Sequence, residues 1–286
     1  MNQMYMLLLG VLGIAAVGSL LSTGDDDPID EGTPVPDLPM IDGTEGPDEL
    51  DGTAGDEILR GLAGEDTIDA GEGDDWIYGG LGDDTVIADA GDDRVFLGQG
   101  DDLYGDPDAG PDVADGNDTI EGGTGDDTVY AGAGDDLILP GDNDDGDDVL
   151  NGGAGRDTID GGDGNDTIGA ADQADDAADS LMGGEGDDRI VLGAGDFADG
   201  GEDRDDYLVH TSYPDSSIAY SPEDRVVIQY VGPAEAPPRI ELVQDGDNVR
   251  VMADGDLVTT LRDTLVRDVS YQVQAQPAAE STATGA

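Results

Sequence analysis

The chain repeats a nine-residue pattern from residue 43 to residue 208, and this period constrains its fold more than any other feature. The first units read GTEGPDELD, GTAGDEILR, GLAGEDTID and AGEGDDWIY, and roughly sixteen units follow one another. Short insertions at residues 106–112 and 170–173 interrupt the series. Self-similarity at a fixed period is typical of a solenoid, in which each unit packs against its neighbours.

Each unit combines turn-forming, acidic and apolar positions in a fixed order. Gly dominates positions one, two and four, Asp or Glu fills position six, and Leu, Ile, Val or Tyr fills position eight. Glycine permits the positive φ angles of a tight turn, and positions seven to nine form a short strand. We predict an all-β fold, a parallel β-roll (β-solenoid) in which two units make one coil with a turn on each edge. Its thin core consists of position-eight side chains such as Leu59, Ile68, Ile77, Val86 and Val95.

Stacked coils bring the position-six carboxylates into line along two edges. Asp66, Asp84 and Asp102 should follow one edge, and Glu57, Asp75 and Asp93 the other. Carboxylates and backbone carbonyls between stacked turns form an all-oxygen site, which suits Ca²⁺ better than Mg²⁺. The chain has no Cys and a single His, so softer metals find few ligands. The candidate calcium ligands are Asp48, Glu57, Asp66, Asp75, Asp84, Asp93, Asp102, Asp118, Asp127, Asp136, Asp148, Asp157, Asp166, Asp179, Asp188 and Asp205.

The tract resembles the repeats-in-toxin (RTX) family, whose motif is G-G-x-G-x-D-x-hydrophobic-x. The units at residues 122–130, 152–160 and 183–191 fit this motif at every position. The resemblance implies a parallel β-roll, several Ca²⁺ ions in the turns and export to a calcium-rich exterior. Three departures make calcium sites doubtful locally: Glu57 replaces Asp, Asp203 replaces Gly, and the stretch around Phe197 lacks the position-six carboxylate.

The charge balance narrows the possible partners. The chain carries 70 acidic and 10 basic residues, a net charge of −60, so a compact state requires bound cations to limit self-repulsion. Few aromatics and high charge are typical of disorder, but a disordered chain has no need of apolar residues in phase. Nucleic acid is excluded as a partner because nothing here could neutralise phosphates.

No enzyme motif appears, and we expect a non-catalytic protein. The single histidine, His210, cannot form the His pair of a zinc protease and is expected on a β surface. No G-x-S-x-G elbow occurs, and carboxylates are too numerous for one pair to stand out as a glycosidase dyad. Trp76 should face outward from its strand, with sugar stacking as an alternative to a plain surface role.

The N-terminal region, residues 1–24, contains an uncharged apolar stretch at residues 4–21. Its length is near the lower limit for a membrane-spanning helix and also suits a signal peptide. No Lys or Arg precedes it, and residues 15–18 offer only a weak cleavage site. We expect an N-terminal hydrophobic helix that anchors the chain to the outer side of a membrane, with a cleaved export signal or a buried core helix as alternatives. Residues 25–42 are an acidic, Pro-rich linker.

The glycine- and Asp-rich repeat of the roll covers residues 43–208, and the residue composition changes after it. Residues 209–275 hold short β-branched runs, and Asp254 and Gly255 predict a hairpin turn. This region is either a cap for the last coil or a small binding module, and residues 276–286 are a disordered tail. The function expected is an extracytoplasmic calcium-binding protein that folds on Ca²⁺ binding. The alternatives are a surface adhesin or matrix protein with the roll as spacer, and a hydrolase that uses Asp residues; no protein or glycan partner is identified.

Overall fold

The computed structural model describes residues 38–105, 116–141, 144–169, 177–233 and 236–276. All of these lie within one compact unit, Pro36–Ala286. The N-terminal helix expected over residues 4–21, most of the linker and the tail at residues 277–286 lie outside the described residues. No helix in the part of the chain that the structure describes has the length and apolar character needed to cross a lipid bilayer.

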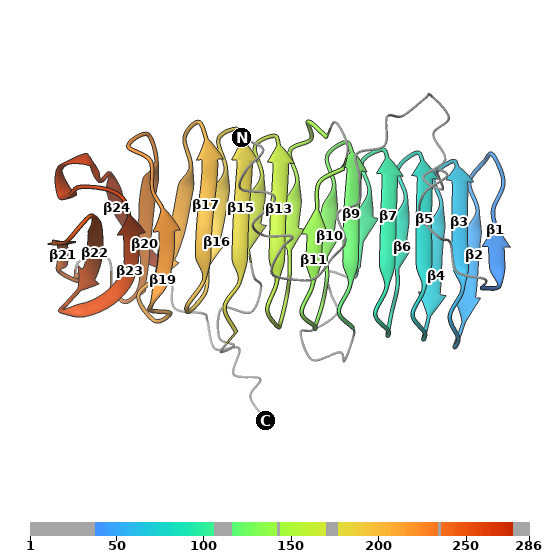
Figure 1. Ribbon diagram of the computed structural model, residues 1–286, viewed down its shortest axis with the longest axis horizontal. Coiled ribbons are helices and arrows are strands. Elements are labelled where there is room, and N and C mark those ends of the chain that lie inside the picture. The colour runs from blue at the N-terminus through green and yellow to red at the C-terminus, as the bar shows by residue number, and fades with distance from the viewer. Residues whose placement is uncertain (1–37, 106–115, 142–143, 170–176, 234–235, 277–286) are drawn as a thin grey trace. The chain divides into compact units, whose positions relative to one another are not determined.

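The strands alternate between two facing sheets along the chain (Figure 1). Odd-numbered strands build most of the first sheet: β1 (Met40–Asp42), β3 (Ile58–Ala63), β5 (Trp76–Leu81), β7 (Arg94–Gln99), β9 (Thr119–Thr124), β11 (Leu137–Leu139), β13 (Thr158–Asp163), β15 (Ser180–Glu185), β17 (Phe197–Glu202) and β19 (Ser216–Ala219). Even-numbered strands build the second: β2 (Glu49–Thr53), β4 (Thr67–Gly71), β6 (Thr85–Ile87), β8 (Leu103–Tyr104), β10 (Thr128–Tyr130), β12 (Val149–Asn151), β14 (Thr167–Gly169), β16 (Arg189–Leu192), β18 (Asp206–His210), β20 (Arg225–Val231) and β24 (Tyr271–Gln276).

Neighbouring strands in each sheet are parallel and come from units two apart. In the first sheet Leu59 pairs with Ile77, and Ile77 pairs with Val95. In the second sheet Ile68 pairs with Val86. The predicted parallel solenoid, with two nonapeptides per coil, is therefore confirmed. The strand β1 begins the first sheet inside the stretch that the sequence assigned to the linker.

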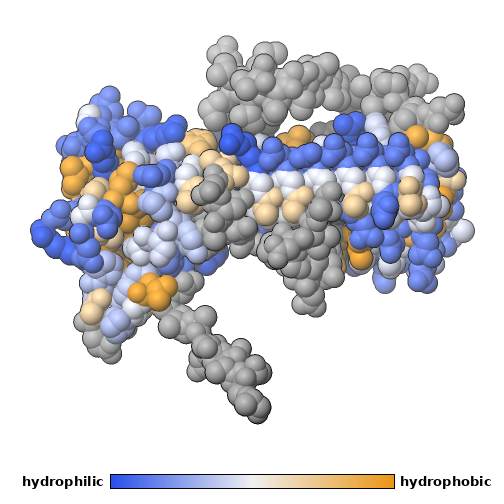
Figure 2. Space-filling view, turned by 90° about the horizontal axis from the view of Figure 1, so that it is seen from below, coloured by the Kyte–Doolittle hydropathy of each residue, from blue (hydrophilic) through white to orange (hydrophobic). Residues whose placement is uncertain are grey.

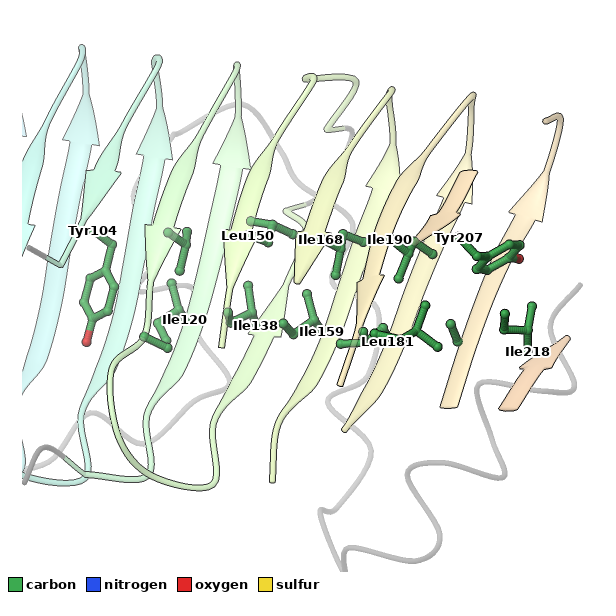
Figure 3. Close-up of a cluster of buried hydrophobic side chains, with 14 of the residues drawn as sticks. Tyr104, Ile120, Ile138, Leu150, Ile159, Ile168, Leu181, Ile190, Tyr207 and Ile218 are labelled. Atoms are coloured by element: carbon green, nitrogen blue, oxygen red, sulfur yellow. The ribbon is translucent and has the colours of Figure 1, made fainter. Parts of the chain in front are cut away.

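The position-eight side chains form the core between the sheets, as predicted. Figure 3 shows these side chains following one another along the solenoid, with Ile120, Ile138 and Ile159 from one sheet facing Leu150 and Ile168 from the other. All but Leu150, which is 4% exposed, have no exposed surface. One large apolar side chain from each unit makes a thin core, so other interactions must hold adjacent coils together.

The parallel pairing continues past the last nonapeptide before the topology changes. β19 pairs with β17 and β20 with β18, both in parallel. The first sheet then ends with β23 (Asp256–Arg262), β22 (Asn248–Ala253) and β21 (Ile240–Asp245), of which β22 pairs antiparallel with both neighbours. The predicted hairpin is confirmed, since Asp254 and Gly255 join β22 to β23 with positive φ angles of 54° and 99°. Within the described residues the sole helical element is a short 3-10 turn, η1 (Val266–Asp268).

Candidate metal centre

The position-six residues form two ladders, one along each row of turns. We call the turns that lead into even-numbered strands the even edge and those that lead into odd-numbered strands the odd edge. The even edge carries Asp48, Asp66, Asp84, Asp102, Asp127, Asp148, Asp166, Asp188, Asp205 and Asp224, and the odd edge carries Glu57, Asp75, Asp93, Asp118, Asp136, Asp157, Asp179 and Asp196. Asp48 is half-buried, and the others are between 0% and 5% exposed. Burying so many carboxylates is costly unless each has a partner.

Backbone hydrogen bonds fix one oxygen of each carboxylate. The N–H of Asp66 donates to Oδ1 of Asp84 at 2.8 Å, and the N–H of Asp84 donates to Oδ1 of Asp102 at 2.7 Å. On the odd edge the N–H of Asp75 donates to Oδ1 of Asp93 at 2.8 Å. After the first rung of each edge, each carboxylate is thus bound by the coil before it, and units two apart share an edge, as the period predicted.

The second carboxylate oxygen has no such donor at many rungs. Among the described residues, Oδ2 is buried without a hydrogen-bond partner in the following ladder members: Asp66, Asp75, Asp84, Asp102, Asp127, Asp166, Asp188 and Asp205. A buried, partnerless carboxylate oxygen is rare in native proteins and demands an explanation such as an ion. At Asp118 the explanation is local, because the phenol of Tyr104 donates to its Oδ2 at 2.8 Å.

At most of these rungs a glycine at position one keeps the space beside Oδ2 free of side chains, whereas Ala70 and Leu97 take that position before Asp75 and Asp102. A Cβ on Gly61 would collide with Oδ2 of Asp66 and with the carbonyl oxygen of Gly79 in the next coil. A Cβ on Gly183 would likewise collide with Oδ2 of Asp188 and lie 2.5 Å from the carbonyl oxygen of Gly200. A carboxylate oxygen and a carbonyl oxygen from adjacent coils therefore face the same space. This donor set fits Ca²⁺, which takes oxygen ligands in flexible geometry.

Burial raises the pKa of the ladder carboxyl groups, and nearby carboxylates raise it further. The pKa reaches about 6 for Asp75, Asp102 and Asp166, about 7 for Asp84 and Asp205, and about 8 for Asp127 and Asp188. The backbone N–H donors oppose this rise without cancelling it. Near neutral pH the ladders therefore need either protons or cations to remain buried.

Backbone oxygens are required to complete any cation site. Within the described ranges, no three carboxylate or imidazole side chains come close enough together to hold a metal ion on their own. The ladder geometry supplies the remaining donors as glycine carbonyls, such as those of Gly79 and Gly200. A carboxylate oxygen and a carbonyl oxygen that face the same space are consistent with the all-oxygen donor set that the sequence predicted.

The sequence of the turns also identifies the family. Segments 40–68, 51–86, 69–104, 112–145, 142–177 and 173–207 match the family model described as RTX calcium-binding nonapeptide repeat (4 copies). The chain belongs to this family. The protein is thus an RTX β-roll with calcium-binding repeats, and its Asp ladders are consistent with Ca²⁺ binding. A comparison of the whole chain with curated proteins finds no match.

The RTX roll keeps its ladders through two of the three sequence departures. Glu57 is buried and starts the odd edge, where its carboxylate accepts hydrogen bonds from the N–H (3.0 Å) and the hydroxyl of Thr53. Asp203 adopts the positive φ, 72°, that glycine usually takes at position four. Asp205, two residues later, remains fully buried in the even edge.

The prediction that the stretch around Phe197 lacks a ladder carboxylate is wrong. Asp196 is 1% exposed and its Oδ1 accepts the N–H of Asp179 at 3.1 Å, as in the other rungs. The two residues are 17 positions apart, whereas regular partners are 18 apart. This unit is one residue short, so counting positions from its glycines misses the carboxylate.

The sequence analysis also missed Asp224, which follows Asp205 on the even edge. Asp224 is 1% exposed, and its Oδ1 accepts the N–H of Asp205 at 3.3 Å. No glycines precede it, so it lies outside the nonapeptide motif. A usable signal exists in the following residues: Asp224-Arg225-Val226 resembles Asp-Arg-Val at residues 93–95 of the repeats.

The position-five residues form a second pair of ladders outside the first. The N–H of Asp74 donates to Oδ1 of Asp56 at 3.1 Å, and the N–H of Asp92 donates to Oδ1 of Asp74 at 3.0 Å. On the even edge the N–H of Asp101 donates to Oδ1 of Asp83 at 3.1 Å. These side chains are exposed, and Figure 2 shows a continuous row of hydrophilic residues along one edge of the roll. The motif treats position five as variable, which is why the sequence analysis assigned it no role.

Of the two single residues that the sequence analysis considered, His210 and Trp76, only His210 differs from the expectation. His210 was expected on a β surface, but it is 5% exposed, and its Nδ1 accepts the N–H of Ser212 at 3.1 Å. It is buried because β18 is covered on both sides, with its ring 5.2 Å from that of Tyr213. Trp76 is half-buried, and the guanidinium of Arg94 lies 4.7 Å from its ring centroid in a cation–π contact.

Coupling between rungs provides a test of the two-edged arrangement. Replacing Asp84 with Asn should weaken calcium binding at the sites shared with Asp66 and Asp102 on the order of tenfold, because one ligand charge is lost. Double-mutant cycles on calcium affinity should give a coupling of about 0.5–3 kcal/mol between Asp84 and Asp102. Asp84 and Asp93 lie on opposite edges and should be additive within about 0.5 kcal/mol. Equal coupling for both pairs would contradict the assignment of the edges.

The glycine at position one provides a second test. In the Gly79→Ala variant the added Cβ would lie 2.7 Å from Oδ2 of Asp84 and would collide with the carbonyl oxygen of Leu97. We expect a stability loss of about 1–3 kcal/mol and weaker calcium binding, measured by thermal unfolding and calorimetry in calcium. Gly46→Ala is the matched control, since a Cβ there meets nothing within 4 Å. Equal behaviour of the two variants would show that the space beside Oδ2 is not needed.

Proposed function

We propose that this chain is a non-catalytic, extracytoplasmic calcium-binding protein whose roll folds when it binds Ca²⁺. The observation that carries the proposal is the row of buried Oδ2 atoms without hydrogen-bond partners. Most of them lie beside a glycine, and at rungs such as Asp66 and Asp188 a carbonyl oxygen of the next coil faces the same space. Such oxygens are costly to bury alone and become favourable when a cation lies between them. Structural metal sites couple binding to folding in the same way.

A calcium-rich exterior is the compartment that suits this chemistry. Extracellular calcium modules bind at roughly 10⁻⁴–10⁻³ M, a concentration that the cytoplasm does not reach. With a net charge of −60, the chain would stay unfolded before export and fold afterwards. The difference in calcium concentration between the cytoplasm and the exterior would then trigger folding of the exported chain.

The direct test is a calcium-uptake measurement on the full chain. Equilibrium dialysis should show several Ca²⁺ ions bound per chain near millimolar free calcium. Mg²⁺ at the same concentration should leave circular dichroism unchanged, because it prefers a tighter octahedral shell and releases its water reluctantly. Absence of calcium uptake, or equal folding with Mg²⁺, would overturn the proposal. The proposal that the chain is non-catalytic is tested by a screen of hydrolase substrates in the presence of calcium, in which no turnover is expected.

The hydrophobic segment at residues 4–21 supports a membrane-anchored location on the outer side. It is uncharged, close to spanning length and followed by an acidic, Pro-rich stretch, although it lies outside the described residues. Cell fractionation with N-terminal sequencing tests this: the intact chain should be recovered with membranes. Recovery of a soluble chain that begins near Ser19 or Ser22 would contradict the anchor and leave the calcium roll unaffected.

A ligand-binding role for the C-terminal region is the second candidate. Several exposed large apolar side chains lie there, including Val231 (61%), Val243 (44%) and Tyr271 (43%). Exposed apolar side chains of this kind occur at contact surfaces. A glycan array probed with the calcium-loaded chain should give calcium-dependent signals if the protein is an adhesin. The absence of binding signals on the array would favour the alternative in which this region caps the last coil.

A further inference from the structure

Several rungs of the even edge depart from the regular spacing of 18 residues, and the turn of one of them contributes an additional buried acidic residue. Asp127 and Asp148 are ladder partners 21 residues apart, whereas Asp148 and Asp166 are separated by the regular 18. The three additional residues lie in the turn before β12. This turn contributes a further acidic residue, Asp144, that the nonapeptide motif does not include.

Asp144 is directed into the turn rather than toward solvent. It is 5% exposed, and its Oδ1 accepts the N–H of Gly146 at 3.0 Å. Its Oδ2 is buried and has no hydrogen-bond partner among the described residues. A surface carboxylate in an insertion would have no reason to be held this way.

Asp144 adds a fourth buried carboxyl group to a rung that otherwise brings together three ladder members, Asp127, Asp148 and Asp166. The hydrogen bond that Asp144 accepts from the N–H of Gly146 holds its carboxylate in the turn that leads to Asp148. Carboxylates buried together in this way are costly unless a proton or a cation lies between them.

We propose that Asp144 and Asp148 together form a divalent-cation site, occupied by Ca²⁺, that binds more tightly than the regular sites of the roll. The inference rests on the proposed calcium-binding function but concerns a ligand outside the repeat motif. Additional carboxylate charge raises the affinity of oxygen-ligand calcium sites. This site fills first as calcium rises, so ordering of the roll begins in its middle, near β12.

The test compares two adjacent charge-neutralising variants of the full chain. Asp144→Asn removes the inward carboxylate but keeps an oxygen that can accept the N–H of Gly146. Asp145→Asn is the matched control, because Asp145 is the next residue and is exposed. Calorimetric titration with Ca²⁺ should show the tightest binding step weakened on the order of tenfold in Asp144→Asn and unchanged in Asp145→Asn. Circular dichroism at saturating calcium should be the same for both variants and the parent chain.

A deletion of residues 142–144 provides an independent variant if Asp144→Asn folds poorly. It restores the regular 18-residue spacing of the neighbouring coils, and we expect it to fold in calcium while losing the tightest step. If the variants bind Ca²⁺ with the parent's tightest step intact, Asp144 and Asp148 share a proton and the inference is wrong. If the parent chain itself takes up no Ca²⁺, the proposed function fails instead, so the two failures are distinguishable.

Discussion

Removal of calcium at pH 7.5 is expected to unfold the roll. A site filled at one hundred times its dissociation constant stabilises the folded chain by about 2.7 kcal/mol. A typical domain has a net stability of only about 5–15 kcal/mol. The stabilisation free energy lost when a few ladder sites are emptied therefore exceeds the stabilisation that the thin core, with one apolar side chain per unit, can supply. Circular dichroism and scanning calorimetry with a chelator should show loss of the β spectrum and of the thermal transition.

Re-addition of Ca²⁺ is the control for this experiment. The β spectrum and the transition should return with excess Ca²⁺ and stay absent with Mg²⁺. A chelated chain that keeps its full β spectrum and the same melting temperature would show that the carboxylate ladders are stable without a cation, contrary to the expectation.

Protonation of the ladder carboxyl groups at low pH is expected to replace part of the stabilisation that Ca²⁺ gives to the folded chain. In the folded chain the pKa of ladder carboxyls such as Asp84 is about 7 and that of Asp127 about 8, against about 3.9 in an unfolded chain. The metal-free folded state thus holds protons that the unfolded state releases. The resulting stabilisation is fully present below pH ~4 and is lost as pH rises through 6–8. One pKa unit of difference corresponds to at most about 1.4 kcal/mol per group, so several rungs together produce a large effect.

The measurement is a pH series with and without calcium. Chelated protein should retain more β structure at pH 4.5 than at pH 8, and the stabilisation by added Ca²⁺ should grow as pH rises through 6–8. The apparent calcium affinity should rise over the same range, because protons and Ca²⁺ compete for the same oxygens. Chelated protein that is more stable at pH 8 than at pH 4.5 would contradict the raised pKa values.

The nine-residue period was sufficient to predict the architecture. Alternation of glycine, acidic and apolar positions fixes which side chain faces the core, as Ile77 and Val95 do, and units two apart pair in parallel. The same period predicted that Asp66, Asp84 and Asp102 share an edge. These features follow from local geometry repeated many times, so a single sequence contains enough information to determine them.

The irregular ladder members could not be predicted by counting. Partners in the ladders are separated by 17 to 25 residues, because a turn can shorten or lengthen while its carboxylate still reaches the next coil. Asp196 lies in a short unit, Asp224 follows a turn without glycines, and Asp144 lies in an insertion. Burial of His210 depends on contacts at the end of the roll, where the repeat gives no information.

The two sets of ladders run in opposite senses, and this has a consequence for how order spreads. After the first rung of each edge, position-six carboxylates accept an N–H from the coil before, as Asp93 does from Asp75. Position-five carboxylates such as Asp74 accept an N–H from the coil after, here that of Asp92. The junction between these two coils therefore has hydrogen bonds in both directions. Where both bonds are present, we expect a folded stretch to offer donors and acceptors to the chain on its N-terminal and C-terminal sides alike, so that growth from a filled calcium site proceeds in both directions.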